Sequence, residues 1–289
     1  MKFNVDWVDA FTGQAFGGNG CAVVHDGAAL SDTTCMAFVR ETSLVECTFT
    51  GPSQVADIRV RYFLASREIP FAGHPTVATV AAMRARGLIP DGALTLETGA
   101  GVVPVTVSGT SVRMRQPAPE FGAMVEPDLV AAVVGLEPGD ILGQPQIVST
   151  GLPFCITEVK DRQTIANATL SPKALADYAL SLGHGASDIM EPYLITRTGA
   201  PEGAHTFGRL LMAPPSPPED PFTGSATGAA GAYLWANGQI DQPTYTAAQG
   251  DDMGRPGRAQ VERIGTPENI SGVAVSGNAH ILMSGELHL

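Results

Sequence analysis

A segment of twenty residues occurs twice in this chain, 151 positions apart. Residues 68–87 read EIPFAGHPTVATVAAMRARG and residues 219–238 read EDPFTGSATGAAGAYLWANG. The nine identical pairs are Glu68/Glu219, Pro70/Pro221, Phe71/Phe222, Gly73/Gly224, Thr76/Thr227, Ala78/Ala229, Ala81/Ala232, Ala85/Ala236 and Gly87/Gly238. Each copy enters through Pro-Phe, turns at a Gly and continues as an Ala-rich helical stretch. Because solenoid repeats are only about 20–50 residues long, this spacing predicts two duplicated halves.

The composition limits the classes of partner. The chain has 289 residues, 44% of them hydrophobic, and a net charge of −12. Its length is enough for two domains of about 100–150 residues. The negative charge argues against nucleic acid or an anionic membrane surface as a partner. The chain shows neither the roughly 18 consecutive apolar residues of a membrane span nor a signal peptide, so we expect a cytoplasmic protein.

The four cysteines indicate no metal site. Cys21, Cys35, Cys47 and Cys155 are scattered and form no CxxC pair. This spacing supports neither metal ligation nor a disulfide framework, and it predicts buried, reduced thiols.

Sequence patterning predicts two sheet-rich halves with few helices. Helical patterns occur at 31–40, with Ser31 as N-cap, and at 75–86, 127–134 and 172–182. Strand patterns occur at 3–8, 22–25, 48–50, 58–63, 94–98, 102–107, 111–115, 146–150, 155–159, 193–198, 209–213, 244–249, 258–264, 272–275 and 279–284.

Proline-rich segments predict where the halves divide. The break at 116–119 separates a first domain, 1–117, from a second, 118–269. We expect the last strands, from about 270 to 289, to return to the first domain. The run 214–218 predicts a stiff, extended lead-in to the second repeat, with an ordinary surface loop as the alternative. The whole is expected to be an α+β fold, in which a sheet wraps around one helix per half, rather than a βαβ fold.

The repeated turns predict an anion site. A helix start presents unpaired N–H groups and the positive end of the helix dipole, which bind carboxylates without a cationic side chain. Gly73 and Gly224 would let the backbone approach a ligand closely. Two such starts facing each other would hold a small carboxylic acid between the halves. The alternative is a pair of purely structural turns inherited from duplication.

Three titratable residues are candidates for proton transfer. His74 follows the first Gly turn, and Asp220, before Pro221, could orient it across the cleft or merely cap a turn. Glu46 precedes an apolar strand, where burial would raise its pKa into the range useful for acid–base work. Judged from its own segment, Glu46 is more simply a solvated residue at a helix end. The sequence contains no GxGxxG, P-loop, HExxH or GxSxG motif.

Together, several motifs resemble the PhzF family of phenazine-biosynthesis-type isomerases. They are GGNGCAVV (17–24), SLVECTF (43–49), EIPFAGHPT (68–76), EDPFTGSATG (219–228) and VAVSGNAHI (273–281). The resemblance implies a diaminopimelate epimerase-like fold with two pseudo-symmetric domains, each a mixed sheet around a central helix. It also implies an active site between the domains, catalysis without cofactor or metal, a homodimer and a small carboxylate substrate.

The resemblance also implies roles for individual residues. It makes Glu46 the acid/base, with His74 and Asp220 as further catalytic residues. The implied substrate-binding residues are Asn19, Gly73, Gly224 and Ser225. Related racemases of this fold use one thiol per half near Ala72/Gly73 and Thr223/Gly224, where this chain has no Cys, so a one-carboxylate proton shift is favoured over two-thiol racemisation.

Departures from the family pattern concern the substrate. Val45 stands where Ser commonly precedes the Glu, and Gly20 replaces a Pro. We therefore expect a cofactor-independent isomerase that shifts a double bond in a small cyclic, amino-acid-derived acid of bacterial secondary metabolism, with the substrate open. The alternatives are an epimerase or racemase of the same fold and a catalytically silent small-acid-binding protein.

Overall fold

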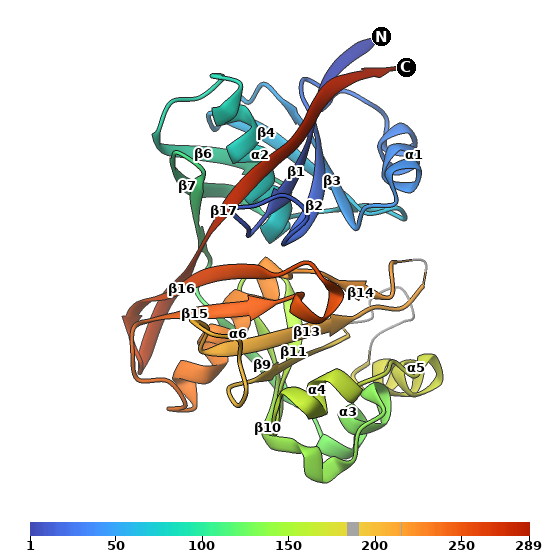
Figure 1. Cartoon of the computed structure of the whole chain (residues 1–289), viewed down its shortest axis with the longest axis vertical. Helices are drawn as coiled ribbons and strands as arrows, with labels where there is room; N and C mark the ends of the chain where they lie inside the picture. Colours follow the sequence, from blue (N-terminus) through green and yellow to red (C-terminus); the bar gives the residue numbers. More distant parts are fainter. Residues whose placement is uncertain (184–190, 215) are drawn as a thin grey trace.

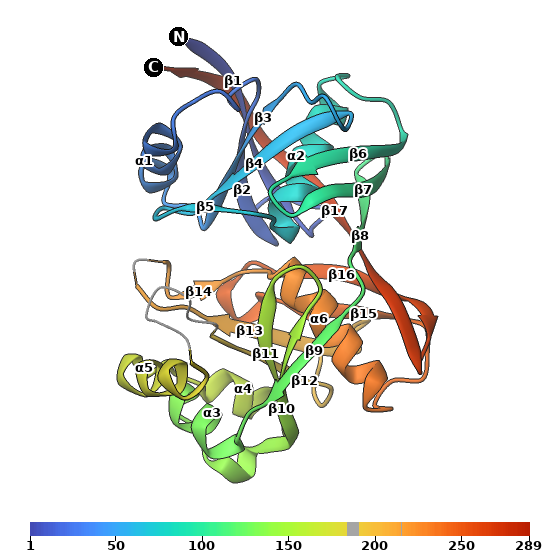
Figure 2. The same ribbon diagram turned by 180° about the vertical axis from the view of Figure 1, so that it is seen from behind.

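The molecule consists of two halves stacked along its long axis. The computed structural model describes residues 1–183, 191–214 and 216–289, so Pro215 of the predicted lead-in lies outside the described residues. Each half has a sheet wrapped around one helix, α2 (Gly73–Ala85) or α6 (Gly224–Ala236), and both views of the ribbon show this repetition (Figure 1, Figure 2). The expected α+β, diaminopimelate epimerase-like architecture is confirmed.

The first half surrounds α2. Its other elements are β1 (Lys2–Ala10), β2 (Asn19–Val24), α1 (Asp32–Thr42), β3 (Glu46–Gly51), β4 (Ile58–Phe63), β5 (Glu68–Ile69), β6 (Gly92–Thr98), β7 (Gly101–Ser108) and β8 (Ser111–Gln116). Ser31 caps α1 as predicted, because its side chain accepts a hydrogen bond from the Thr34 N–H at 3.2 Å. The sheet is mixed, with β2 parallel to β3 and β4 parallel to β6.

The second half surrounds α6. Its other elements are β9 (Glu120–Met124), α3 (Pro127–Val134), η1 (Pro138–Asp140), β10 (Ile141–Ser149), β11 (Pro153–Val159), α4 (Arg162–Asn167), α5 (Pro172–Ser181), β12 (Pro192–Thr196), β13 (Thr206–Leu211), β14 (Glu219–Asp220), β15 (Thr244–Gln249), η2 (Asp251–Met253) and β16 (Gly257–Thr266). Here too the sheet is mixed, since β11 pairs parallel with β12 and β13 with β15.

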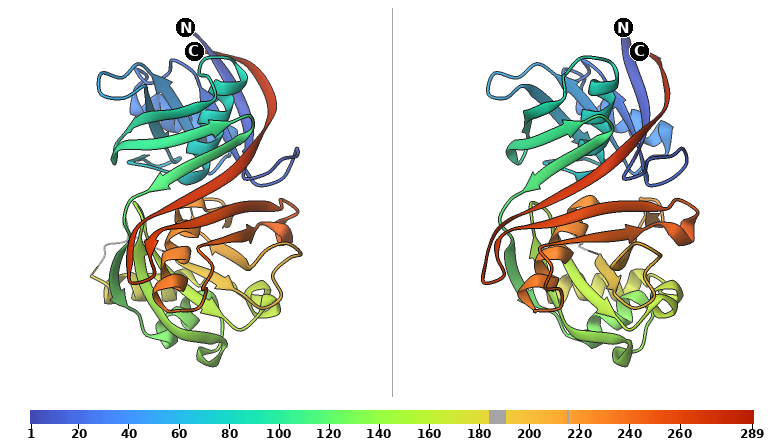
Figure 3. Two further views of the ribbon diagram at one scale, coloured as in Figure 1. Left: turned by 90° about the vertical axis from the view of Figure 1, so that its left-hand side faces the viewer. Right: turned by 60° about the vertical axis from the view of Figure 1, so that its left-hand side comes forward.

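One long strand joins the halves. β17 (Asn269–His288) first pairs with β16, then with β8 and finally with β1, so it crosses from the second half to the first (Figure 3). The sequence pattern predicts two separate strands here, whereas the structure has one. Both chain ends consequently lie at the far end of the first half (Figure 1).

The two central helices are buried on every side. All residues from Gly73 to Met83 in α2 and from Gly224 to Trp235 in α6 are buried. A helix enclosed in this way has no polar face, which explains why both repeat copies are rich in Ala and small residues. Small side chains let the surrounding strands approach closely.

The repeated Glu residues have equivalent partners. Arg61 on β4 donates to Glu68 at 2.8 Å, and Arg209 on β13 donates to Glu219, also at 2.8 Å. Each arginine also donates to backbone carbonyls of its own half. Arg61 donates to the carbonyls of Ala28 and Leu30. Arg209 donates to those of Ile165 and Ala168. The Glu of each copy therefore orients an arginine side chain, and this arginine holds the neighbouring loops through hydrogen bonds to their carbonyls.

The repeated Thr residues are equivalent too. The hydroxyls of Thr76 and Thr227 donate to the backbone carbonyls of residues 72 and 223, one turn earlier in each helix. The first also contacts the Tyr62 hydroxyl at 2.8 Å and the second the Tyr193 hydroxyl at 3.4 Å. The bonds to the carbonyls match and support the duplication, whereas the two tyrosines come from strands that do not correspond, β4 and β12.

β2, α1 and β3 form a parallel βαβ unit within the expected α+β architecture. One expectation about a single residue needs correction. Glu46 does not end a helix in solvent: it begins β3, opposite Cys21 in the sheet register, and its side chain is 13% exposed.

Candidate active site

The two repeat copies bring their helix starts into contact. A Cβ added to Gly73 would lie 2.8 Å from the Ser225 nitrogen and 2.9 Å from the Gly224 Cα, and one added to Gly224 would lie 2.8 Å from the Phe11 ring. Glycine fits best at both positions, because a methyl group would overlap the opposite backbone at Gly73 and the Phe11 ring at Gly224. Neither helix start receives a side-chain capping hydrogen bond, so first-turn N–H groups of both helices are available to a ligand.

Asn19 connects the halves beside these helix starts. Its Nδ2 donates to Asp220 Oδ1 at 2.6 Å and to the Phe222 carbonyl at 3.0 Å, and it lies 3.0 Å from His74 Nδ1. The first two partners are acceptors only, so they fix the orientation of the amide. Nδ2 has two hydrogens for these three partners, so at most two of them accept from Asn19 at one time.

His74 is a neutral imidazole at neutral pH. Burial lowers its pKa to about 3, because the charged form would lose its hydration. Its Nδ1 lies 3.6 Å from Glu46 Oε2, and this contact is therefore not an ion pair at neutral pH. The buried Nε2 has no close hydrogen-bond partner within the described residues, although the Gly20 backbone acts as a weak acceptor for the ring.

Glu46 and Asp220 are two carboxyl groups with raised pKa values. Burial raises the pKa of Glu46 well above its ordinary value, and the charge of Asp220 raises it further. Burial also raises the pKa of Asp220, to about 6, although hydrogen bonds from Thr223 and Asn19 oppose the shift. Both groups can therefore exchange a proton closer to neutral pH than ordinary carboxyls.

The turn that carries Asp220 is held by buried polar groups that the sequence analysis missed. The Thr223 hydroxyl donates to Asp220 Oδ2 at 2.6 Å, and the Gln249 side chain accepts from the Thr223 N–H at 3.0 Å and donates to the Asp220 carbonyl at 2.7 Å. Gln116 similarly donates to the Gly224 carbonyl at 3.0 Å. The local sequence holds no signal for these contacts, because their partners lie up to 108 positions away.

A salt bridge between the halves supports the segment that carries Asn19. Arg255 donates to Asp9 Oδ1 at 2.7 Å and to the carbonyls of Gly17 at 3.0 Å and Gly18 at 2.9 Å. Asp9 is only 1% exposed, and its other oxygen accepts from the Phe16 N–H. The pair therefore fixes the residues directly before Asn19.

A cavity of about 830 Å³ lies between the halves. Of the residues singled out in the sequence, it is lined by Glu46, Gly73, His74, Asp220, Gly224 and Ser225. Asn19 is fully enclosed and reaches the site through its bonds to His74 and Asp220. The structure thus brings all seven candidate residues to one location. The remaining walls are mostly apolar, with Phe154, Leu210 and Met212 among them.

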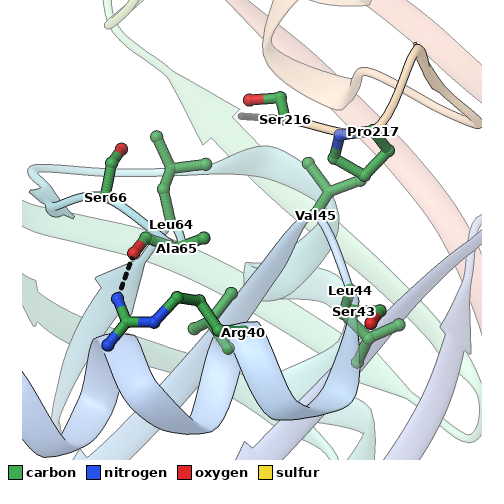
Figure 4. Close-up of a pocket in the computed structure, with 10 residues that line it drawn as sticks. Arg40, Ser43, Leu44, Val45, Leu64, Ala65, Ser66, Ser216 and Pro217 are labelled. Atoms are coloured by element: carbon green, nitrogen blue, oxygen red, sulfur yellow. Dashed lines mark hydrogen bonds between the residues drawn. The ribbon is translucent and has the colours of Figure 1, made fainter. Parts of the chain in front are cut away.

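A smaller pocket of about 390 Å³ adjoins this cavity. The two share Val45, Leu64, Ser66 and Ser216 as lining residues, so they form connected spaces. Figure 4 shows Arg40 against the Ala65 carbonyl, to which it donates at 2.7 Å. The pocket lies next to Val45, the residue immediately before Glu46.

The cysteines lie outside the cavity lining. All four are buried free thiols, as predicted. The residues at the helix N-caps, where the thiols of the related racemases are expected, are Ala72 and Thr223, and both line the cavity. No opposed pair of thiols therefore faces the cavity in the described part of the chain.

Two features are absent from residues 1–183, 191–214 and 216–289. These residues contain no group of three or more His, Cys, Asp or Glu side chains placed to hold a metal ion. They also contain no helix with the length and apolar character needed to cross a bilayer.

Comparison with known proteins gives consistent matches over the full chain. Residues 8–285 match the PhzC-PhzF family, described as phenazine biosynthesis-like protein. The trans-2,3-dihydro-3-hydroxyanthranilate isomerase of Pseudomonas aeruginosa is 30% identical, with 98% of each chain covered. The uncharacterized isomerase YddE of Escherichia coli is 32% identical, with 99% of this chain and 98% of the relative covered.

Solved structures give the same result at the level of the fold. A PhzF-family phenazine biosynthesis protein of Bacillus anthracis superposes with a TM-score of 0.86 at 28% identity, and each chain is covered completely. A hydroxyproline epimerase of Agrobacterium vitis has a TM-score of 0.65 at 15% identity, covering 99% of this chain and 91% of its own. The second likeness concerns the fold alone.

Proposed function

Given that the chain belongs to the phenazine biosynthesis-like PhzC-PhzF family and is an isomerase, we propose that it moves a proton between two carbons of a small cyclic, amino-acid-derived carboxylic acid. In this proposal Glu46 is the single acid/base, and the reaction shifts a double bond without a cofactor.

The observation that carries the proposal is the environment of Glu46. The residue lines the cavity, its pKa is raised by burial, and its Oε2 lies 3.6 Å from the neutral His74 ring. A carboxyl of this kind can take up a proton and release it again within one turnover. No cysteine faces it across the cavity, so the described geometry supports one base better than two opposed bases.

The helix starts supply the proposed binding site for the substrate carboxylate. First-turn N–H groups after Gly73 and Gly224 are uncapped, lie beside the cavity and carry the positive ends of two helix dipoles. They would hold the carboxylate and stabilise negative charge that develops next to it. The hydroxyl of Ser225 lies in the same turn.

The proposed step balances without a second reactant. The C–H bond next to the activating group breaks, its proton goes to Glu46, and the electron pair delocalises through the adjacent double bond. Glu46 then returns the proton to the far carbon of that system, so one new C–H bond forms and the double bond moves. Asp220, held by Asn19 and Thr223, and the neutral imidazole of His74 would hold the amine or hydroxyl groups of the substrate.

The substrate class follows from the family and the cavity. The P. aeruginosa relative is named for trans-2,3-dihydro-3-hydroxyanthranilate, a cyclic amino acid. We propose a related cyclic acid, since Val45, which departs from the family pattern, lines the cavity and changes the wall next to Glu46. The homodimer, the cytoplasmic location and the lack of nucleic-acid or membrane partners stay predictions.

The test is the substitution Glu46→Gln, with Glu41→Gln as the matched control. Glu41 lies in the same segment but is exposed and does not line the cavity. Loss of a general acid/base is expected to lower kcat on the order of 10²–10⁴-fold, while the control keeps wild-type turnover. Unchanged turnover in Glu46→Gln would refute the acid/base role.

Deuterium from D₂O separates the isomerase from its rivals. A double-bond shift should place the label on a ring or side-chain carbon, whereas a racemase would label Cα with inversion. If no small carboxylic acid binds at all, all three hypotheses are wrong: the isomerase, the racemase and the catalytically silent binding protein.

A further inference from the structure

The cavity extends well beyond the groups needed for proton transfer. Its volume of about 830 Å³ lies toward the upper end of the roughly 300–1,000 Å³ usual for pockets that hold drug-sized ligands. One six-membered ring with its carboxylate occupies only part of such a space. The lining residues remote from Glu46 therefore have a bearing on which substrate the cavity accepts.

Glu191 is an acidic residue on the remote wall. It directly precedes β12 and is one of the cavity-lining residues. In the sheet register Asp220 pairs with Leu210, and Leu210 pairs with Tyr193, so Glu191 lies two strands across and two residues along from Asp220. Strand spacing and rise per residue then put the two Cα atoms about 12 Å apart.

The carboxylate of Glu191 has acceptor capacity left. It accepts from the Ala213 N–H at 3.1 Å and from its own backbone N–H, whereas a carboxylate offers about four acceptor positions. Burial raises the pKa of Glu191, and the positive charge of Arg67 on the opposite half counteracts this shift. The neighbouring walls, Leu152, Pro153 and Phe154, are apolar, so a donor group that reaches Glu191 would meet little competition from water.

We propose that Glu191 is a second binding point of the cavity, which accepts hydrogen bonds from an ammonium group at the end of the substrate remote from its carboxylate. This inference rests on the proposed function, because it takes the carboxylate to be anchored at the two helix starts. It adds that the substrate carries, besides the groups held at Asp220 and His74, an ammonium group remote from its carboxylate. The carboxylate and this ammonium group would face opposite ends of the cavity.

Three ring acids that differ in one substituent test this inference on the full-length protein. The probes are cyclohexanecarboxylate, trans-4-(aminomethyl)cyclohexane-1-carboxylate and trans-cyclohexane-1,4-dicarboxylate, and their Kd values are measured by calorimetry. The aminomethyl acid is expected to bind at least about tenfold more tightly than the plain acid, since a charge-assisted hydrogen bond has about this effect. The diacid is expected to bind more weakly than the plain acid, because Glu191 repels its second carboxylate.

The variants assign this preference to one side chain. Glu191→Gln should lose the about tenfold preference for the aminomethyl acid and bind the plain acid as the wild type does, which also shows that the variant is folded. Glu191→Asp keeps the charge and should keep part of the preference. Glu126→Gln removes one exposed carboxylate outside the cavity and should behave as the wild type.

Two kinds of failure are distinguishable. If the acids bind without preference, or if the preference persists in Glu191→Gln, Glu191 is not a binding point. If none of the acids binds to the wild type, the carboxylate site at the helix starts is absent and the proposed function fails first. In that case the inference falls with it.

Discussion

The substitution Gly73→Ala tests the contact between the two central helices. The added Cβ would lie 2.8 Å from the Ser225 nitrogen and 2.9 Å from the Gly224 Cα, whereas ordinary contacts begin at 3.4 Å. The helix starts must therefore move apart by about 0.6 Å, as judged from these ordinary contacts. Because both atoms belong to the backbone of the opposite helix, no side chain can rotate away to make room.

The expected loss of stability follows from this overlap. Overpacking in a rigid interior costs about 1–3 kcal/mol, and the better helix propensity of Ala offsets at most about 1 kcal/mol of it. The net cost is at most about 3 kcal/mol, and each kcal/mol lowers the Tm by about 2–4 °C in chains somewhat shorter than this one, so we expect a decrease of up to about 12 °C. The matched control is Gly13→Ala, where an added Cβ meets no atom within 4 Å.

Calorimetric melting of both variants, followed by titration with cyclohexanecarboxylate, is the assay. Gly73→Ala should melt lower than Gly13→Ala and bind the acid at least about tenfold more weakly, because the first-turn N–H groups of the two helices no longer converge. If both variants melt alike and bind alike, the helix starts do not meet as described, and the proposed carboxylate site is wrong.

Two further variants test buried charges. The folded state holds the proton of Asp220 more tightly than the unfolded chain, since its pKa is about 6 rather than 3.8. The wild type should therefore lose about 3 kcal/mol of stability relative to Asp220→Asn as the pH rises from 3 to 7.5, measured by urea unfolding at each pH; a constant difference contradicts the shift. Arg255→Ala leaves the buried Asp9 carboxylate unpaired and should cost about 2–4 kcal/mol, less than a fully buried pair because Arg255 is 31% exposed. Urea midpoints check this value, and Arg255→Lys should recover part of the loss; equal midpoints for both variants would show that charge pairing is not involved.

The strongly patterned elements could be predicted from the sequence. The bounds 58–63, 127–134 and 244–249 agree with the structure, because apolar alternation or a Pro at the first helical position marks them clearly. β9, at 120–124, was missed because every one of its residues is exposed, so it shows no alternation of burial. α4, at 162–167, is too short for helical periodicity, although its N-cap Asp161 was a usable signal.

The residues of the candidate site could be predicted from the sequence, but the hydrogen bonds that join them could not. The repeat and the family resemblance name Glu46, His74 and Asp220, and the structure places all three on one cavity. The link between them could not be predicted, because Asn19 contacts Asp220 across 201 positions of sequence. The burial of Glu46 likewise comes from neighbouring strands and from the other half of the molecule. The local sequence alone therefore predicts a solvent-exposed side chain.

The path of β17 has a consequence for the order in which the chain folds. Its last residues, 279–288, pair with β1 at the opposite end of the sequence, and Lys2 lies opposite His288 in this register. Pairing across almost the whole chain slows folding, because a very long loop must close before these contacts form. During synthesis these residues are made after the other strands around α6. The half that is translated first is therefore the half whose sheet is completed last, and until then β1 has an unpaired edge where β17 will bind.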